Sequence, residues 1–432
     1  MIRLFHSADW HLGQTLHGFD RAQEHEIVLE AMLRIIETER VDAVLLAGDI
    51  YHVANPPVLA QRAFFDFIRK LAERAPQTEL VVIAGNHDSG PRLELPEALG
   101  VGDRVRILGA PPRNADGPDP SAAVLALRDA EGAPRAALIA LPYPRPGDLY
   151  GLADSGASEP RAFMSEAAAH ARRAYPGLPI IVATHLHVRG GEATEASERP
   201  ILIGGEDAIS LQDFPPDAAY VALGHLHRPQ TLKGAPLSAY SGPPIPLSVD
   251  EAANEQGVCI VDVAMKGGVA EVDLRRVALP RPRGFLRAPE QGASPLPTLE
   301  RELAALASRL KDDPSAAAAP PFLEVAVTLD GPAPDLRRRI ETALDDAPAR
   351  LVRIRRFGVG GDRSESSGEA SPPEPPSPSG AFTELYARRY DTAPPDALSA
   401  AFAALLQSVL DEEAASPPPA SGEDREDAGA AP

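Results

Sequence analysis

The sequence predicts an α/β fold, because short apolar runs in its first half alternate with helical segments and end at polar loops. Five such runs lack the polar alternation of a half-exposed strand. Runs of this kind are typical of strands that are buried on both faces of a sheet. In open α/β sheets, ligands bind at the carboxyl ends of the strands, where the loops converge. The five runs cover residues 2–5, 41–47, 80–84, 180–183 and 220–223.

Two helices are expected among these runs. Residues 23–40 have helical spacing in their apolar side chains, at Ile27, Met32, Ile35 and Ile36. The segment Asn55-Pro56-Pro57 is typical of an N-cap followed by proline at a helix start, which predicts a helix to about residue 73. This second helix is more apolar than one buried face needs, at Phe64, Phe65, Phe67 and Ile68. Packing against the sheet explains most of these side chains.

The loops that follow the five runs carry a set of residues that suits two divalent cations. Such a site needs one carboxylate that bridges both ions, together with further oxygen and imidazole donors. Residues two apart point the same way from an extended backbone, which pairs Asp9 with His11 and His225 with His227. Any one of these residues alone is an ordinary loop or turn residue. Together, in order and at strand ends, they predict a two-metal hydrolytic site made of Asp9, His11, Asp49, Asn86, His185, His225 and His227.

His87 follows the candidate ligand Asn86 and is better placed to face a substrate than a metal. An imidazole there would stabilise charge that develops at phosphorus, or protonate the leaving oxygen. Asp88 would orient His87, or would cap the turn that follows it. We therefore take His87 and Asp88 as candidate catalytic residues.

These residues and the motifs around them resemble the calcineurin-like metallophosphoesterases, and among them the SbcD nuclease subunits of bacterial SbcCD complexes. The resemblance is close over residues 1–275 and looser to about residue 410. The motifs that carry it are Ser7-Ala8-Asp9-Trp10-His11-Leu12-Gly13, Gly48-Asp49-Ile50-Tyr51-His52, Gly85-Asn86-His87-Asp88, Leu141-Pro142-Tyr143, Ser197-Glu198-Arg199, Gly224-His225-Leu226-His227-Arg228-Pro229-Gln230, Tyr240-Ser241-Gly242-Pro243-Pro244 and Ser248-Val249-Asp250-Glu251.

The resemblance implies a four-layer α/β/β/α sandwich and assigns a ligand set to each ion. Asp9, His11, Asp49 and His227 would hold the first metal, and Asp49, Asn86, His185 and His225 the second. By the same resemblance, His52 lies near the scissile phosphate and is a third candidate catalytic residue. The hard, mixed oxygen and nitrogen donors favour Mn²⁺, while iron and zinc stay open on ligand type alone.

The family resemblance also implies a function and its partners. It implies a manganese-dependent DNA nuclease for DNA repair, replication and recombination, acting as an exonuclease from 3′ ends of duplex DNA and as an endonuclease on single strands and hairpins. The expected assembly is a heterotetramer of two nuclease subunits, paired as a homodimer, with two SbcC-type ATPase subunits. The resemblance also implies that helices on the flank of residues 55–73 pair the nuclease subunits, so contact with a second copy is an alternative use of its apolar side chains. This sequence has no Gly-x-x-x-x-Gly-Lys phosphate-binding loop, so ATP dependence would come from the partner.

The sequence after the nuclease domain (1–275) divides into four further parts. Residues 276–357 predict a small α+β capping domain, with helices at 299–311 and 335–344 and strands at 322–329 and 351–357. Its arginines, at 337–339, 353, 355 and 356, either contact phosphate or face solvent. Residues 358–380 have the composition of a flexible linker, and 413–432 that of a disordered acidic tail. Between them, residues 381–412 predict two helices that dock onto the ATPase or fold back. The partner-binding stripe of the longer helix is Leu398, Phe402, Leu405, Leu406 and Val409.

Composition limits the remaining possibilities. The single cysteine, Cys259, excludes disulfides within the chain, and no apolar run is long enough to span a bilayer, so we expect a cytoplasmic protein that joins the nucleoid when bound to DNA. The formal net charge of −20 argues against broad attraction to DNA. Two alternatives therefore stay open: a phosphodiesterase for nucleotides or other small phosphoesters, and a non-catalytic scaffold of the ATPase complex.

Overall fold

The computed structural model describes residues 1–98, 104–152, 158–192 and 208–358, together with Pro395 and Leu398. The described residues up to 358 belong to one compact unit, Met1–Arg363. Several predicted segments lie outside the described residues: the linker, both predicted C-terminal helices, the acidic tail and the Ser197-Glu198-Arg199 motif. Of the predicted partner-binding stripe, only Leu398 is described, and its side chain is 41% exposed. In the described part of the chain, no helix is both long and apolar enough to cross a membrane.

The first sheet contains six strands in the order β16-β15-β1-β4-β5-β6. Its parallel strands are β1 (Ile2–Ser7), β4 (Ala43–Ala47), β5 (Glu79–Ile83) and β6 (Val105–Leu108). A long hairpin continues the sheet beyond β1, in antiparallel pairing, with β15 (Gly257–Lys266) and β16 (Val269–Ala278). This sheet therefore runs to Ala278, three residues past the expected end of the nuclease domain.

The second sheet also contains six strands, in the order β13-β14-β12-β11-β10-β9. The strands β10 (Pro134–Leu141), β11 (Ile180–His185), β12 (Ala218–Gly224) and β14 (Ser238–Tyr240) are parallel. The edge strands β9 (Val124–Arg128) and β13 (Gln230–Thr231) are antiparallel to their neighbours. The three central parallel pairs bring the ends of β11 and β12 to one edge of the sheet.

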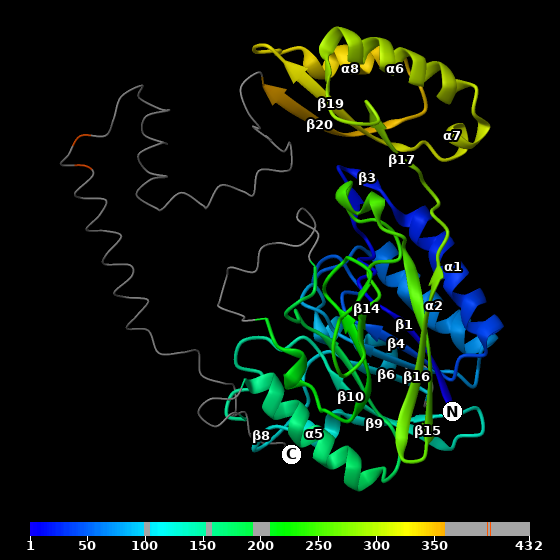
Figure 1. Cartoon of the computed structure of the whole chain (residues 1–432), viewed down its shortest axis with the longest axis vertical. Helices are drawn as coiled ribbons and strands as arrows, with labels where there is room; N and C mark the ends of the chain where they lie inside the picture. Colours follow the sequence, from blue (N-terminus) through cyan, green and yellow to red (C-terminus); the bar gives the residue numbers. More distant parts are fainter. Residues whose placement is uncertain (99–103, 153–157, 193–207, 359–394, 396–397, 399–432) are drawn as a thin grey trace, which may run out of the picture. The chain divides into compact units, whose positions relative to one another are not determined.

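The two sheets pack face to face, and helices cover their outer faces (Figure 1). Apolar side chains of the first sheet pack against α1 (Ala22–Glu39) and α2 (Val58–Arg74) on one face and against the second sheet on the other. In β4, Val44 and Leu46 point toward these helices, whereas Ala43, Leu45 and Ala47 point toward the second sheet. Helix α5 (Glu159–Ala174) covers the far face of the second sheet. The expected four-layer α/β/β/α sandwich is confirmed.

The helix predicted from the Asn55 motif begins later than expected. Pro57, not Asn55, is the N-cap of α2, and no side chain caps the first turn. Proline at this position presets the backbone angle φ of the helix entry without offering a hydrogen bond. Phe64, Phe67 and Ile68 are buried against the sheet, as the packing interpretation expects.

The capping region forms a separate small sheet with helices on one face. Strands β17 (Phe285–Ala288), β18 (Ser294–Pro295) and β20 (Arg350–Gly358) all pair parallel with β19 (Phe322–Leu329). Helices α6 (Leu296–Lys311), α7 (Pro314–Ala318) and α8 (Leu336–Leu344) supply the rest of its core. All four secondary-structure elements predicted for this region are present within three residues of their expected ends.

The remaining described elements are short connections. They are β2 (Thr15–Leu16), β3 (Phe19–Asp20), α3 (Gly90–Leu93), α4 (Leu95–Ala98), β7 (Arg113–Asn114), β8 (Gly117–Pro118), and the 3₁₀ turns η1 (Pro120–Ala123), η2 (Leu211–Asp213) and η3 (Asp250–Ala253).

Candidate metal centre

Loops from both sheets place all seven candidate ligands in one site. The loop after β1 carries Asp9 and His11, and the loops after β4, β5 and β12 carry the others, except that His185 is the last residue of β11. Four of the seven have left-handed backbones, with φ of 56° at Asp9, 45° at His11, 51° at Asp49 and 107° at His225. The expectation that an extended backbone aims Asp9 and His11 is therefore wrong. A left-handed conformation is uncommon for residues other than glycine, and such outliers cluster at functional sites.

Two glycines allow these loops to approach closely. A Cβ atom at Gly85 would lie 2.1 Å from Oδ1 of Asp49, and one at Gly48 would lie 2.3 Å from Nδ1 of His185. Both distances are too short for any side chain, so only glycine permits the observed spacing. The glycines before Asp49 and Asn86 thus position ligands from neighbouring strands as well as turning the chain.

Asp49 lies at the centre of the site. Its Oδ1 accepts a hydrogen bond of 2.9 Å from the backbone N–H of His87. Its Oδ2 is 3.5 Å from Nε2 of His11 and 3.4 Å from Nε2 of His185. One carboxylate oxygen therefore lies between imidazoles that belong to the two expected ligand sets, which is the position of a bridging ligand.

Asp9, His11 and His227 form the first group of candidate ligands, with ligand atoms within 4.8 Å of one another. Oδ2 of Asp9 and Nε2 of His11 are buried and have no hydrogen-bond partner. Leaving a buried polar atom unpaired is costly, and coordination of a cation satisfies both atoms. The donor set of this group fits a divalent metal ion.

His185, Asn86 and His225 form the second group. Nδ1 of His185 donates to the carbonyl of Ala47 at 2.8 Å, which leaves Nε2 as the ring atom that faces the site, 3.0 Å from Oδ1 of Asn86. Nδ1 of His225 is 3.2 Å from the same oxygen, and its backbone N–H donates to Oδ1 of Asp9 at 2.9 Å. Three side chains that can coordinate a cation thus converge beside Asp49, and this group also fits a divalent ion once that ion displaces the proton on Nε2 of His185.

Burial and neighbouring charges shift the pKa values of these groups in opposite directions. Burial raises the pKa of Asp9 to about 7, and burial lowers that of His225 to about 3. Burial also disfavours the charged form of His185, but the carboxylate of Asp49 outweighs it and raises the pKa of His185 to about 9. His185 and His11 in turn hold the pKa of Asp49 well below its usual range, although burial opposes this. The site therefore contains buried groups that compete for protons. A bound cation would displace these protons.

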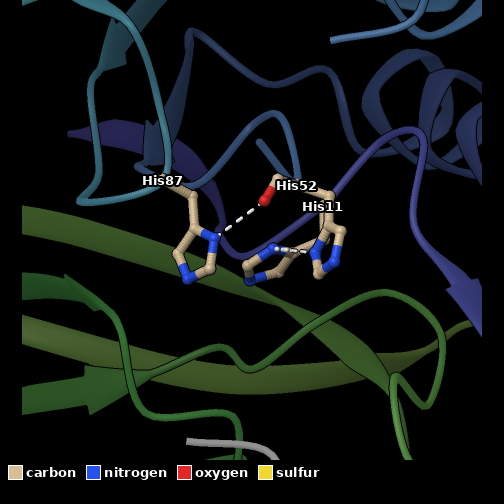
Figure 2. Close-up of side chains that lie close together, drawn as sticks. All are labelled: His11, His52 and His87. Carbon is tan, nitrogen blue, oxygen red and sulfur yellow. Dashed lines mark hydrogen bonds between the residues drawn. The ribbon is translucent and has the colours of Figure 1, made fainter. Parts of the chain in front are cut away.

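The rings of His11, His52 and His87 lie side by side (Figure 2). Nδ1 of His87 donates to the backbone carbonyl of His52 at 2.8 Å, which leaves Nε2 of His87 as its available ring atom. Nδ1 of His52 is 3.3 Å from Nδ1 of His11, and the rings of His52 and His87 are stacked. His52 thus contacts both a candidate ligand and the candidate catalytic imidazole.

Asp88 does not orient the ring of His87, contrary to expectation, because the carbonyl of His52 holds that ring. The carboxylate of Asp88 is fully buried and accepts backbone hydrogen bonds from Gly85, Ile50 and Tyr51, at 2.9 to 3.1 Å. Burial raises its pKa to about 7, and the nearby charge of Asp49 adds to this effect. Asp88 joins the loops after β4 and β5, so its role is to hold Asp49 and Asn86 in place.

Two residues near the site were not identified as contributors from the sequence. Glu251 lies within a motif but contacts a candidate ligand 24 positions away, with 3.0 Å between its Oε1 and Nδ1 of His227. Arg145 donates to the backbone carbonyl of Asp88 at 2.7 Å, next to His87. Neither contact leaves a local signal, because each joins separate loops.

Comparison with known proteins agrees with this site. Residues 2–229 match the family model of calcineurin-like phosphoesterases, and residues 292–390 match that of the type 5 capsule protein repressor C-terminal domain. The SbcD subunit of the nuclease SbcCD from Rhodobacter capsulatus is 40% identical over 81% of this chain and 86% of its own. The Escherichia coli K12 protein of the same name is 30% identical over 82% of this chain and 85% of its own. The Bacillus subtilis protein of that name is 37% identical over 60% of this chain and 66% of its own.

The match to the phosphoesterase model covers every candidate ligand, and the relatives extend the similarity across both the sandwich and the cap. This chain belongs to the calcineurin-like phosphoesterases and, within them, to the SbcD family of SbcCD nuclease subunits.

Proposed function

We propose that this chain is the metal-dependent nuclease subunit of an SbcCD-type complex and hydrolyses DNA phosphodiesters. The single observation that supports this most is the position of Asp49, whose Oδ2 lies between Nε2 of His11 and Nε2 of His185. A bridging carboxylate between two imidazole-containing groups is what a two-metal phosphodiesterase requires. Membership in a family whose curated members are named nucleases agrees with this chemistry.

The proposed ligands of the first ion are Asp9, His11, Asp49 and His227, and those of the second are Asp49, Asn86, His185 and His225. Bound divalent cations supply Lewis-acid activation of the phosphodiester and of a water nucleophile. Oxygen and imidazole donors in this mixture suit Mn²⁺, which we propose as the metal. Because Nδ1 of His185 and of His227 are occupied by Ala47 and Glu251, both rings offer Nε2 to a metal.

His87 is the proposed catalytic imidazole. With its Nδ1 proton donated to the carbonyl of His52, the ring keeps a fixed direction, and Nε2 is free to carry a proton to the leaving oxygen. His52 supports this ring by stacking and by its carbonyl, and we propose that its own imidazole lies near the scissile phosphate.

The proposed partners are DNA and an SbcC-type ATPase, in a heterotetramer with a homodimer of nuclease subunits. The segment 381–412, with the stripe that contains Phe402 and Leu405, would dock onto the ATPase. Val58 and Leu59 at the start of α2 are 78% and 69% exposed, which supports contact with a second copy on this flank. We propose the cytoplasm and the nucleoid as the place of action.

Phosphate contact by the cap is less well supported than the metal site. Four of the six arginines that the sequence singled out already pair with carboxylates, namely Arg337, Arg338, Arg339 and Arg353. We therefore expect the two ions, once bound, to supply most of the attraction for the phosphodiester.

One assay tests the proposal against its alternatives. The purified full chain with Mn²⁺ is offered labelled duplex DNA, hairpin DNA and a generic aryl phosphodiester. We expect cleavage of all three, with DNA favoured in kcat/KM. Activity on the aryl phosphodiester alone would favour a small-molecule phosphodiesterase, and no hydrolysis of any substrate by the metal-loaded chain would favour the scaffold.

A further inference from the structure

The 3₁₀ turn η3 (Asp250–Ala253) has contacts that the proposed mechanism does not use. It follows β14 and contains the end of the Ser248-Val249-Asp250-Glu251 motif. Three consecutive residues of this motif have different contacts: Val249 packs against an apolar cluster shared by the cap and the nuclease domain, Asp250 contacts the cap, and Glu251 contacts a candidate metal ligand. Such a turn is positioned to connect the two.

Glu251 holds His227 from behind. Its side chain is fully buried, and Oε1 is 3.0 Å from Nδ1 of His227. The second oxygen, Oε2, accepts the backbone N–H of Leu247 at 2.8 Å, which fixes the carboxylate plane. A carboxylate that receives the outer N–H of an imidazole fixes the tautomer and orientation of the ring and makes its other nitrogen a stronger metal ligand. Glu251 therefore has the geometry of a positioning residue for His227.

Asp250, the preceding residue, holds the cap. Its two carboxylate oxygens accept from Nη1 and Nη2 of Arg353 on β20, at 2.9 and 2.7 Å. Such two-point pairs are stronger and more directional than single ones. Arg353 also pairs with Glu324 on β19, a buried residue that Arg287 on β17 contacts as well. We call the paired side chains of Asp250 and Arg353 the clasp; through Glu324 it is connected to three strands of the cap sheet.

Apolar contact reinforces this clasp. Val249 packs against a cluster that contains Phe322 and Val352 of the cap and Leu16 of the nuclease domain. Nearby, the guanidinium of Arg21 lies 5.1 Å from the ring centroid of Phe322 and donates to the carbonyl of Pro246, just before η3. The cap therefore contacts the η3 loop through both charged and apolar side chains.

We propose that η3 couples the cap to the metal site. The cap fixes the position of η3 through Asp250 and Val249, and the fixed turn holds Glu251 where it orients the ring of His227. The inference rests on the proposed function, since it takes His227 to be a metal ligand. If the cap were displaced from Asp250, the turn would loosen and the ion held by Asp9, His11 and His227 would bind with lower affinity. In this arrangement, seating of the cap determines how tightly the first metal is bound.

The test measures metal affinity rather than activity. The full chain is stripped with a chelator, and Mn²⁺ binding is followed by calorimetry for the wild type, Asp250→Asn, Glu251→Gln and His227→Ala. Asp250→Asn breaks the charged clasp but leaves Arg353 paired with Glu324, so the cap keeps no buried unpaired charge. Arg337→Gln is the matched control, because it breaks an exposed ion pair with Glu341 inside the cap, away from η3.

We expect Glu251→Gln to lower the affinity for one of the two Mn²⁺ ions by about 10- to 100-fold. This is the usual effect of removing the hydrogen-bond partner of a metal-binding histidine. Asp250→Asn should weaken the same ion several-fold, and Arg337→Gln should match the wild type. In the chain loaded with Co²⁺, the visible absorption bands should shift in Glu251→Gln and Asp250→Asn but not in Arg337→Gln. A thermal melt of each variant shows whether it is folded, and Asp250→Asn alone decides the coupling if Glu251→Gln does not fold.

Two results have different meanings. If Asp250→Asn binds Mn²⁺ with the affinity and spectrum of Arg337→Gln, the coupling is wrong while the metal site stands. If His227→Ala retains both ions at wild-type affinity, the ligand assignment in the proposed function is wrong instead.

Discussion

Replacing His87 with Asn separates metal binding from chemistry at this site. The backbone N–H of His87 donates to Oδ1 of Asp49 at 2.9 Å, and Asn at this position keeps that bond. The amide of Asn can also donate to the carbonyl of His52, as Nδ1 of His87 does now. The variant therefore retains the local hydrogen bonds that position Asp49 and loses only a group able to carry a proton.

The expected loss follows from that difference. General acid–base catalysis by a positioned side chain contributes about 10²- to 10⁴-fold, so turnover should fall by at least about 10²-fold. At about 1.36 kcal/mol for each factor of ten, this corresponds to about 3–5 kcal/mol of transition-state stabilisation. Manganese content should remain at the wild-type level, because no side-chain atom of a proposed ligand is removed.

The assay is single-turnover cleavage of labelled DNA with Mn²⁺, with bound metal measured on the same preparations. His170→Asn on α5 is the matched control, since it makes the same chemical change away from the site. A second substrate, an aryl phosphodiester whose leaving group departs without protonation, should be much less affected if His87 acts as the acid. Loss of bound manganese in proportion to activity would show that His87 is a ligand and would refute the reasoning.

Three other predictions follow from the same structure. Asp49→Ala should abolish hydrolysis and lower the bound manganese measured by elemental analysis, because the shared ligand is lost; near-normal activity would overturn the two-metal assignment. Truncation after residue 380 should leave intrinsic Mn²⁺-dependent cleavage intact and remove both co-purification with the ATPase and stimulation by ATP, and full-affinity binding would contradict docking by 381–412. Burial lowers the pKa of His25 to about 4, so the unfolded chain takes up a proton below about pH 6.5 that the folded chain does not. His25 should therefore contribute about 3 kcal/mol to the fall in unfolding free energy between pH 6.5 and 4. In denaturant titrations, the fall in His25→Gln should be smaller than in the wild type by about this amount, and an equal fall in both would contradict the prediction.

The sequence predicted most of what depends on local pattern. Strands such as β4 were recognisable because all five residues are buried, and a doubly buried strand leaves an unbroken apolar run. The cap elements were recognisable for a similar reason, since β19 spans the predicted 322–329. The candidate ligands could be grouped from the sequence because parallel strands bring their polar ends to one edge, whatever the details of the loops.

What the sequence did not predict depends on contacts between loops. Asp88 was expected to orient His87 or to cap the turn that follows it, but its three backbone donors come from loops after two strands. Glu251 and His227 are separated by 24 positions, and no spacing rule links them. Such contacts are set by how the two sheets pack, which the pattern of apolar residues does not specify.

The left-handed backbones of the ligands relate the stability of the fold to its function. Conformations of this kind cost about 1–3 kcal/mol each, and Asp9, His11, Asp49 and His225 all adopt them. Glycine would remove this strain but would also remove the ligand, so substitution cannot relieve it without loss of the site. The strain persists because the strands on which these loops stand are fixed by three apolar cores, one between the sheets and one under the helices on each side. The double sheet therefore does more than carry the loops: its rigidity holds the candidate metal ligands in conformations that an isolated loop would leave.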